Sequence, residues 1–178
     1  MLQNYNIWKT ASIFFYEPTS EHCLKEISLK TKVAHTSVKK HLLKLIKQKI
    51  ILEKFEKKGK RIYPIYSSNI EGEKYKHYKA IFNLDNLFLS NLIKYLEESI
   101  MPKSIVLFGS YSIGEDIEDS DIDIFIEAEE VSLDLLKYEK KLKRRIQLHF
   151  NKNFNSYPIE LKNSILNGKT LFGNLELR

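Results

Sequence analysis

The chain has 178 residues, 43% of them hydrophobic and 29% charged. This composition is typical of globular proteins with a buried core and excludes an intrinsically disordered chain; the length suits one large domain or two small ones. The sequence contains neither the ~18 consecutive apolar residues of a membrane helix nor a signal peptide, so we expect a cytoplasmic protein without membrane contact. The single cysteine, Cys23, excludes an internal disulfide and has no partners at zinc-finger spacing, so we expect it in the core of a helix.

Charge is distributed unevenly along the chain. Residues 1–70 hold 14 Lys and Arg against 5 Asp and Glu, a net charge of +9, whereas residues 71–178 hold 15 against 18, a net charge of −3. A basic front part indicates a polyanionic partner for that part alone. The alternative is a general enrichment in lysine without a function.

The segment over residues 20–68 begins with the pattern of two helices. Ser20 is suited to cap a first helix that runs to about Thr31. Residues 32–34 then form a turn, and from His35 the apolar residues recur at helical spacing while polar and basic residues occupy the other faces. This is the pattern that a DNA-recognition helix requires.

A two-stranded ribbon is predicted next. Two short apolar strands, over residues 50–52 and 63–66, flank a basic turn over residues 57–60. In that turn, Gly59 supplies the positive φ that a tight hairpin needs. The basic tip of the ribbon can therefore reach phosphate groups.

The stretch SLKTKVAHTSVKKHLLKLIKQKIILEKFEKKGKRIYPI resembles the winged helix-turn-helix DNA-binding domains of bacterial and archaeal regulators, and the resemblance covers about residues 5–70. We expect double-stranded DNA as a partner: lysines contact phosphates and set the affinity, while polar groups at the helix start contact base edges in the major groove. The residues expected to bind DNA are His35, Thr36, Ser37, Lys39, Lys40, Lys44, Lys58, Lys60 and Arg61. Because such regulators are often dimers, a homodimer is expected. The fold also serves as a protein-binding module, and exposed lysines are commonly only solvated, so these alternatives stay open.

Residues 71–100 predict a helical connector. The segment lacks proline, and its apolar residues suit an amphipathic helix that packs on a second domain: Leu87, Leu89, Leu92, Ile93 and Leu96. The first half of the connector, which mixes Lys and Tyr, suits a hinge or a dimer contact.

The back half contains the residues that suggest chemistry. An apolar strand over residues 103–108 ends at a tight turn made by Gly109 and Ser110. On a following strand, Asp121 and Asp123 project from one face while isoleucines occupy the other. Two carboxylates placed in this way can share hard divalent cations, and a Gly-Ser turn offers N–H groups and a hydroxyl to phosphates.

The stretch LFGSYSIGEDIEDSDIDIFIE resembles the G-S…D-x-D signature of polymerase-β-type nucleotidyltransferases, especially the small minimal prokaryotic branch. The resemblance implies a mixed sheet flanked by helices. It also implies that Gly109 and Ser110 bind a nucleoside triphosphate, and that Asp121 and Asp123 are catalytic and ligate Mg²⁺ or Mn²⁺. In this chemistry, metal ions held by aspartates activate the attacking hydroxyl and neutralise the pyrophosphate leaving group.

Two departures from the family pattern weaken the case for turnover. Active members add a third acidic residue on a later strand, but on the corresponding strand, residues 145–150, this place is taken by Gln147, with His149 on the same face. Minimal members also have a basic residue where this chain has Ile113. Glu160 is a possible substitute carboxylate, although an exposed structural role is favoured for it.

The remaining segments predict support for this site. A loop contains Glu115, Asp116, Glu118 and Asp119, for which we expect solvent exposure rather than metal ligation. Helical periodicity over residues 131–142 ends in a basic cluster suited to a polyanionic acceptor or to helix capping. A further helix is expected between Pro158 and Gly168, and residues 171–173 are expected to be packing residues.

These observations predict an α+β protein with a winged helix-turn-helix domain over residues 1–70, a helical connector over 71–100 and a nucleotidyltransferase-like domain over 101–178. The leading hypothesis is an enzyme that moves a nucleotidyl group, most simply AMP from ATP, to a protein or nucleic-acid hydroxyl. The winged helix would target it or autoregulate an operon, as in an antitoxin-like enzyme that modifies a partner toxin. The alternative is a DNA-binding transcriptional regulator with a catalytically degenerate domain, and a third possibility is an interaction protein.

Overall fold

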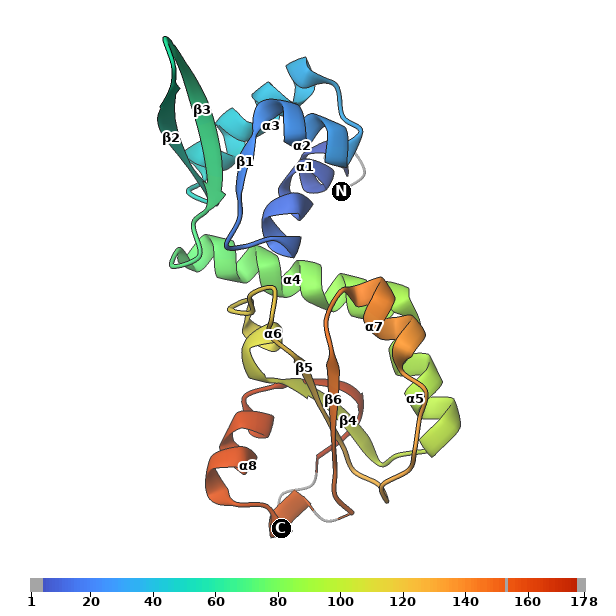
Figure 1. Ribbon diagram of the computed structural model, residues 1–178. Helices are drawn as coiled ribbons and strands as arrows, with labels where there is room; N and C mark the ends of the chain where they lie inside the picture. The colour runs from blue at the N-terminus through green and yellow to red at the C-terminus, as the bar shows by residue number, and fades with distance from the viewer. Residues whose placement is uncertain (1–4, 153, 176–178) are drawn as a thin grey trace. The chain divides into compact units, whose positions relative to one another are not determined.

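The computed structural model describes residues 5–152 and 154–175. The chain is α+β and divides into two compact units, Met1–Lys79 (unit 1) and Ala80–Arg178 (unit 2), each with a sheet flanked by helices (Figure 1). Among the described helices, none combines the length and the apolar character that crossing a membrane requires.

Three helices form the body of unit 1: α1 (Tyr5–Tyr16), α2 (Leu24–Thr31) and α3 (His35–Lys47). Lys32 follows α2 in the left-handed conformation, with φ 54°, and turns the chain into α3. This confirms the predicted turn and the predicted start of the second helix. The apolar stripe of α3 faces the core, where Val38, Leu42 and Leu45 are buried.

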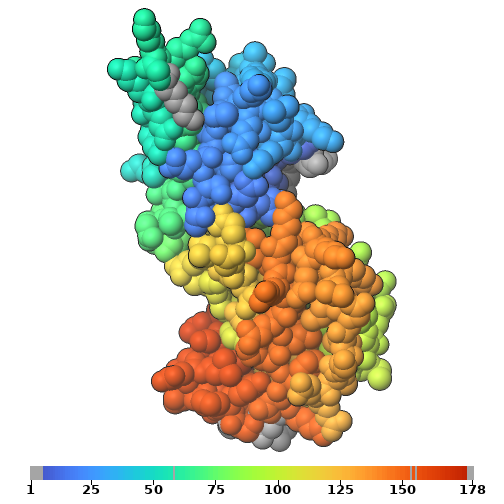
Figure 2. Space-filling model, viewed as in Figure 1, coloured from blue at the N-terminus to red at the C-terminus, as the bar shows by residue number. Residues whose placement is uncertain are grey.

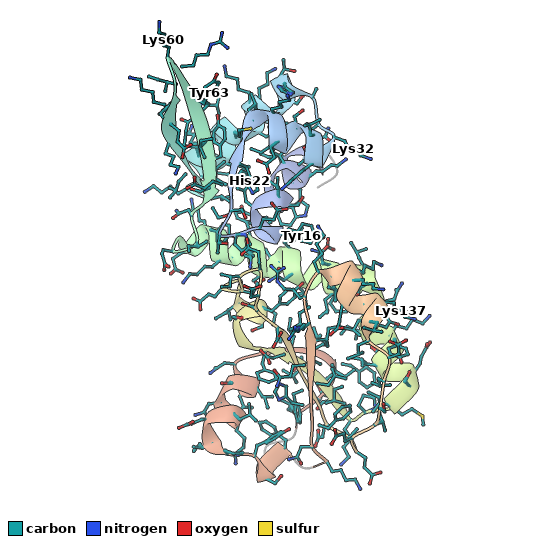
Figure 3. All side chains as sticks on the ribbon, viewed as in Figure 1. Tyr16, His22, Lys32, Lys60, Tyr63 and Lys137 are labelled. Carbon is teal, nitrogen blue, oxygen red and sulfur yellow. The ribbon has the colours of Figure 1, made fainter. Side chains whose placement is uncertain are left out.

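Unit 1 also contains an antiparallel sheet in the order β1-β3-β2, with β1 at Glu21–Cys23, β2 at Ile51–Lys58 and β3 at Arg61–Ser68. Strands β2 and β3 are longer than predicted and form a hairpin. Its last pair is Lys58 with Arg61, so the connecting turn has two residues, and Gly59 in it adopts φ 64° as expected. The hairpin stands out from the body of unit 1 (Figure 2), and Lys60 lies at its tip (Figure 3).

The predicted helix start at Ser20 is wrong. Residues Glu21–Cys23 pair with Ile65–Ser67 of β3, and α2 begins only at Leu24. Cys23 is therefore a half-buried strand residue rather than a helix core residue. Pairing with a strand more than 40 residues away overrides the local capping signal, which is short-range.

Two helices, rather than one, follow unit 1's sheet: α4 (Glu73–Ser90) and α5 (Leu92–Ile100). They are separated by Asn91 in the left-handed conformation, with φ 64°. The boundary between the units falls inside α4. Its first turns belong to unit 1, where the Tyr75 hydroxyl is buried and donates a hydrogen bond to the carbonyl of Phe14 at 2.8 Å.

The sheet of unit 2 is mixed, with strand order β6-β5-β4-β7. Its strands are β4 (Ser104–Phe108), β5 (Ile122–Ile126), β6 (Ile146–Phe150) and β7 (Lys169–Gly173); β5 and β6 run parallel and the other pairs antiparallel. This confirms the expected mixed sheet flanked by helices. Residues 171–173, expected only as packing residues, belong instead to the edge strand β7.

Alternation along β5 divides unit 2 into two cores. Ile122, Ile124 and Ile126 pack with residues of α5 and of α7 (Leu136–Leu142). On the opposite face, Phe125 packs with Phe154 and with Ile165 of α8 (Ile159–Leu166). Figure 1 shows α5 and α7 on one side of the sheet and α8 on the other. Asp123, two residues before Phe125, therefore lies on the α8 side.

Helix α7 is shorter than the predicted helix over residues 131–142. It starts at Leu136, whose N–H donates a hydrogen bond to the Asp134 carboxylate at 3.1 Å. Asp, which competes with the helix by bonding nearby backbone groups, accounts for this late start. The basic end of the predicted helix is retained.

Candidate active site

The Gly-Ser turn lies directly beside one of the two aspartates. Strand β4 ends at Phe108, which pairs with Asp123 of β5, and Gly109 then begins the one-turn helix α6 (Gly109–Ile113) with φ 70°. A Cβ atom added to Gly109 would lie 2.5 Å from Oδ2 of Asp123. Only glycine fits here, because it combines a positive φ with contact between backbone and carboxylate.

The two aspartates share one face of the sheet. Asp121 immediately precedes β5 and Asp123 lies within it, and both are half-buried, whereas Ile122 between them is fully buried on the other face. Alternation along the extended chain accounts for this arrangement. The tertiary structure thus brings Asp121, Asp123 and the Gly-Ser turn to the same end of the β4–β5 pair.

The place beside Asp123 on β6 is occupied by Gln147. The parallel register pairs these two residues, so that their side chains project from the same face, and Gln147 is exposed. Its amide oxygen can ligate a cation, but it carries no negative charge. Glu160, considered as a substitute, is exposed in the first turn of α8.

His149 contacts Asp123, which the sequence did not predict. Its Nε2 atom lies 3.2 Å from Oδ1 of Asp123, and its ring stands edge-on to Phe108 with centroids 5.0 Å apart. Sequence alternation placed His149 on the same face as Gln147, but the contact depends on the register of β6 against β5. At the far end of β6, the Tyr157 hydroxyl donates to the carbonyl of Phe150 at 3.1 Å, and burial raises the pKa of this phenol.

The acidic loop is only partly solvated. Asp116 is 2% exposed; its Oδ1 accepts a hydrogen bond from Asn83 at 2.7 Å and its Oδ2 lies 3.5 Å from Nη2 of Arg144. The expectation of solvent exposure was therefore wrong for Asp116, although it is correct for Glu115 and Asp119. A buried carboxylate with these partners anchors the loop that leads to Asp121.

A cleft of about 560 Å³ adjoins Asp121. Its volume is in the range of small-molecule sites. It is lined by the end of the acidic loop and by the basic end of α7: Glu118, Asp119, Ser120, Asp121, Glu139, Lys140, Lys143, Arg144 and Arg145. Asp121 and Arg145 each precede one of the paired parallel strands, and the Ile122 N–H donates to the Arg145 carbonyl at 2.8 Å. Cationic side chains thus line the same cleft as a candidate metal ligand, an arrangement suited to phosphate groups.

Unit 1 contains a second group of candidate metal ligands. Among the described residues, Glu17, His22 and Glu26 have ligand atoms within 4.8 Å of one another. The ammonium group of Lys30 already lies 2.7 Å from Glu17 Oε2 and 3.0 Å from Glu26 Oε1. The pKa of Lys30 is raised, mainly by its hydrogen bond with Glu17. Burial of the Glu26 carboxyl opposes its ionisation, but hydrogen bonds with Lys30 and His22 outweigh this effect and lower its pKa. The group is therefore a salt-bridge cluster in which a lysine supplies the cation.

The residues predicted to bind DNA lie on two elements of unit 1. At the start of α3, His35 and Thr36 are exposed and Ser37 is half-buried. The exposed lysines and arginine are distributed between α3 and the hairpin: Lys39, Lys40, Lys44, Lys60 and Arg61. The side chain of Lys58 lies outside the described part of the structure.

Residues 90–176 match the family described as polymerase beta, nucleotidyltransferase. Unit 2 contains a nucleotidyltransferase domain. The match includes the Gly-Ser turn, both aspartates and the four strands β4–β7, which confirms the resemblance for this part of the sequence. It does not include residues 1–89.

The nucleotidyltransferase assignment has support from one relative. A protein of Methanocaldococcus jannaschii named "Putative protein adenylyltransferase MJ1379" is 43% identical over 56 residues, which are 28% of this chain and 56% of that protein. The match thus spans little more than half the length of that relative. No solved structure matches the chain.

Proposed function

We propose that this protein is a metal-dependent nucleotidyltransferase that transfers AMP from ATP to a hydroxyl group of a protein or nucleic acid. The observation that carries the proposal is the contact between Gly109 and Asp123, with Asp121 on the same face and beside a basic cleft. The named activity of the M. jannaschii relative favours AMP as the transferred group.

The donor set fits a divalent cation. Carboxylate oxygens are preferred ligands of Mg²⁺ and Mn²⁺, so Asp121 and Asp123 would hold the ion, and the amide oxygen of Gln147 is available beside them. When bound, the ion supplies neutralisation of phosphate charge and acidifies the attacking hydroxyl.

The chain's own groups bind and orient the reactants. N–H groups and the hydroxyl of the Gly109–Ser110 turn would bind phosphate oxygens, and Arg145 and Lys143 in the cleft would bind further phosphate charge. The acceptor oxygen forms a bond to the α-phosphorus while the bond to the bridging α–β oxygen breaks, pyrophosphate leaves, and the acceptor proton passes to solvent.

For unit 1 we propose a winged helix-turn-helix domain that binds double-stranded DNA. The element order α1-β1-α2-α3-β2-β3, the exposed polar start of α3 and the basic tip of the hairpin support this assignment. The domain would bring the enzyme to DNA or autoregulate its operon as a homodimer, and a toxin-like protein would be the acceptor.

The activity is tested by incubating the protein, alone and with the product of the neighbouring gene, with α-labelled nucleoside triphosphates and Mg²⁺ or Mn²⁺. We expect covalent label on a protein or nucleic acid, with unlabelled ATP as the best competitor. If no nucleotide labels any acceptor while the protein binds its own operator, the enzyme proposal fails. The second candidate, a DNA-binding regulator without turnover, is favoured by one observation, namely Gln147 at the place of a third carboxylate.

DNA binding by the full-length protein should weaken steeply with added salt, because each neutralised phosphate releases counterions. We consider a variant in which Lys39, Lys40 and Lys44 are all replaced by Ala. In a plot of the logarithm of the association constant against the logarithm of the salt concentration, its slope should be smaller in magnitude by about 0.9 for each phosphate that the variant no longer neutralises. Fluorescence anisotropy at several salt concentrations measures this slope. Lys94→Ala, which removes one exposed lysine of α5 in unit 2, is the control and should leave the slope unchanged. An affinity that is equal at low and moderate salt would contradict DNA binding.

A further inference from the structure

His149 is the one imidazole in contact with a proposed metal ligand among the described residues. Its Nε2 lies 3.2 Å from Oδ1 of Asp123, and the two side chains are 22% and 25% exposed, so both can reach a bound ion. Phe108 packs against the ring and restricts its orientation. The ring is thus held with a nitrogen toward the carboxylate.

The spacing of these two atoms suits joint ligation of one ion. Neighbouring ligands of an octahedral ion with bonds of ~2.1 Å lie ~3.0 Å apart. The observed 3.2 Å therefore requires only a small adjustment for a cation to replace the hydrogen bond between Asp123 and His149. Among the described residues, Asp121, Asp123 and His149 do not have ligand atoms that all lie within 4.8 Å of one another. The side chain of Asp121 would therefore have to move toward the other two to complete a set of two carboxylates and one imidazole.

We propose that His149 is the third ligand of the divalent ion and that it makes this site bind Mn²⁺ in preference to Mg²⁺. The inference rests on the proposed function, because it concerns the same metal site. A set made only of carboxylates suits Mg²⁺, which prefers oxygen ligands, whereas imidazole nitrogen suits first-row transition metals. Gln147, the residue paired with Asp123, offers an amide oxygen as a ligand but neither a negative charge nor a nitrogen that can ligate a metal.

Metal binding to the full-length protein tests this directly, without any measurement of transfer. The electron paramagnetic resonance signal of free Mn²⁺ falls when the ion binds, and adding Mg²⁺ measures competition. We expect wild-type protein to bind one Mn²⁺ that Mg²⁺ displaces only in large excess. His149→Ala should weaken Mn²⁺ binding by about tenfold or more and leave Mg²⁺ binding nearly unchanged.

Three further variants separate the possible outcomes. His77→Ala removes an exposed histidine of unit 1 and should change nothing. Glu17→Gln disrupts the salt-bridge cluster; if it abolishes Mn²⁺ binding while His149→Ala does not, the ion belongs to unit 1 and the inference is overturned. If Asp123→Asn abolishes binding and His149→Ala has no effect, the metal site stands and His149 is not its ligand. If neither affects binding, the proposed metal site itself fails.

The smaller change His149→Asn guards against misfolding, and thermal unfolding without metal checks each variant. A second readout uses the wild-type protein alone. In nuclear magnetic resonance spectra, bound paramagnetic Mn²⁺ should broaden the ring proton signals of one of the five histidines at one equivalent of metal. If all five ring signals stay sharp with Mn²⁺ bound, the inference is overturned.

Discussion

Asp121→Asn and Asp123→Asn should each reduce nucleotidyl transfer by about 10²–10³-fold, because metal ligation contributes several kcal/mol of charge stabilisation in the transition state. Each substitution keeps the size of the side chain but removes its negative charge. The measurement is the initial rate of label transfer from α-labelled ATP at saturating metal.

Asp85→Asn is the matched control for this pair. Asp85 is exposed on α4, so the change alters the net charge equally without touching the site. It should transfer label at the wild-type rate, and thermal unfolding should be similar for all three variants. Wild-type rates in both Asp121→Asn and Asp123→Asn would rule out these carboxylates as metal ligands for catalysis.

Gly109→Ala should lower both stability and transfer. A Cβ there would lie 2.5 Å from Asp123 Oδ2, closer than real contacts allow, and the positive φ of 70° costs an alanine about 1–2 kcal/mol in addition. Asp123 must move to relieve the clash, so transfer should fall by about tenfold or more beyond any loss of folded protein. Chemical denaturation and initial rates measure the two effects.

Gly59→Ala separates backbone strain from the clash. Gly59 has a similar φ of 64°, but an added Cβ would meet nothing within 4 Å. This variant should lose only about 1–2 kcal/mol in the stability of unit 1 and keep full transfer activity. If Gly109→Ala is as active as Gly59→Ala, the close approach of Gly109 to the site has no role in catalysis.

The two proposed functions are an active nucleotidyltransferase and a DNA-binding regulator without turnover. They differ in the consequence that they attach to Gln147, which takes the place of a third carboxylate. A third carboxylate would provide more charge for a second metal ion, and its absence favours either a regulator without turnover or a site completed by another ligand. His149, in contact with Asp123, is the side chain that the structure offers for that role. Metal binding and label transfer together distinguish the two cases.

Local patterns in the sequence predicted most of the candidate site. The buried strand β4, the Gly-Ser turn and the alternation of Asp121 and Asp123 with isoleucines follow from periodicity and glycine, which act over a few residues. The same holds for the start of α3 at His35 and for the hairpin turn at Gly59. These features depend on neighbours in the chain, so a single sequence shows them.

Only the tertiary structure decided the features that depend on distant pairing. Strand β1 forms because residues 21–23 meet β3, and the short edge strand β7 forms because residues 169–173 meet β4; neither has a strong pattern of its own. The burial of Asp116 requires Asn83 and Arg144, which come from other elements. The contact of His149 with Asp123 depends on the parallel register of β5 and β6. Hydrophobic alternation alone does not specify this register, because alternation determines the face on which a side chain lies but not which residue of the next strand lies beside it.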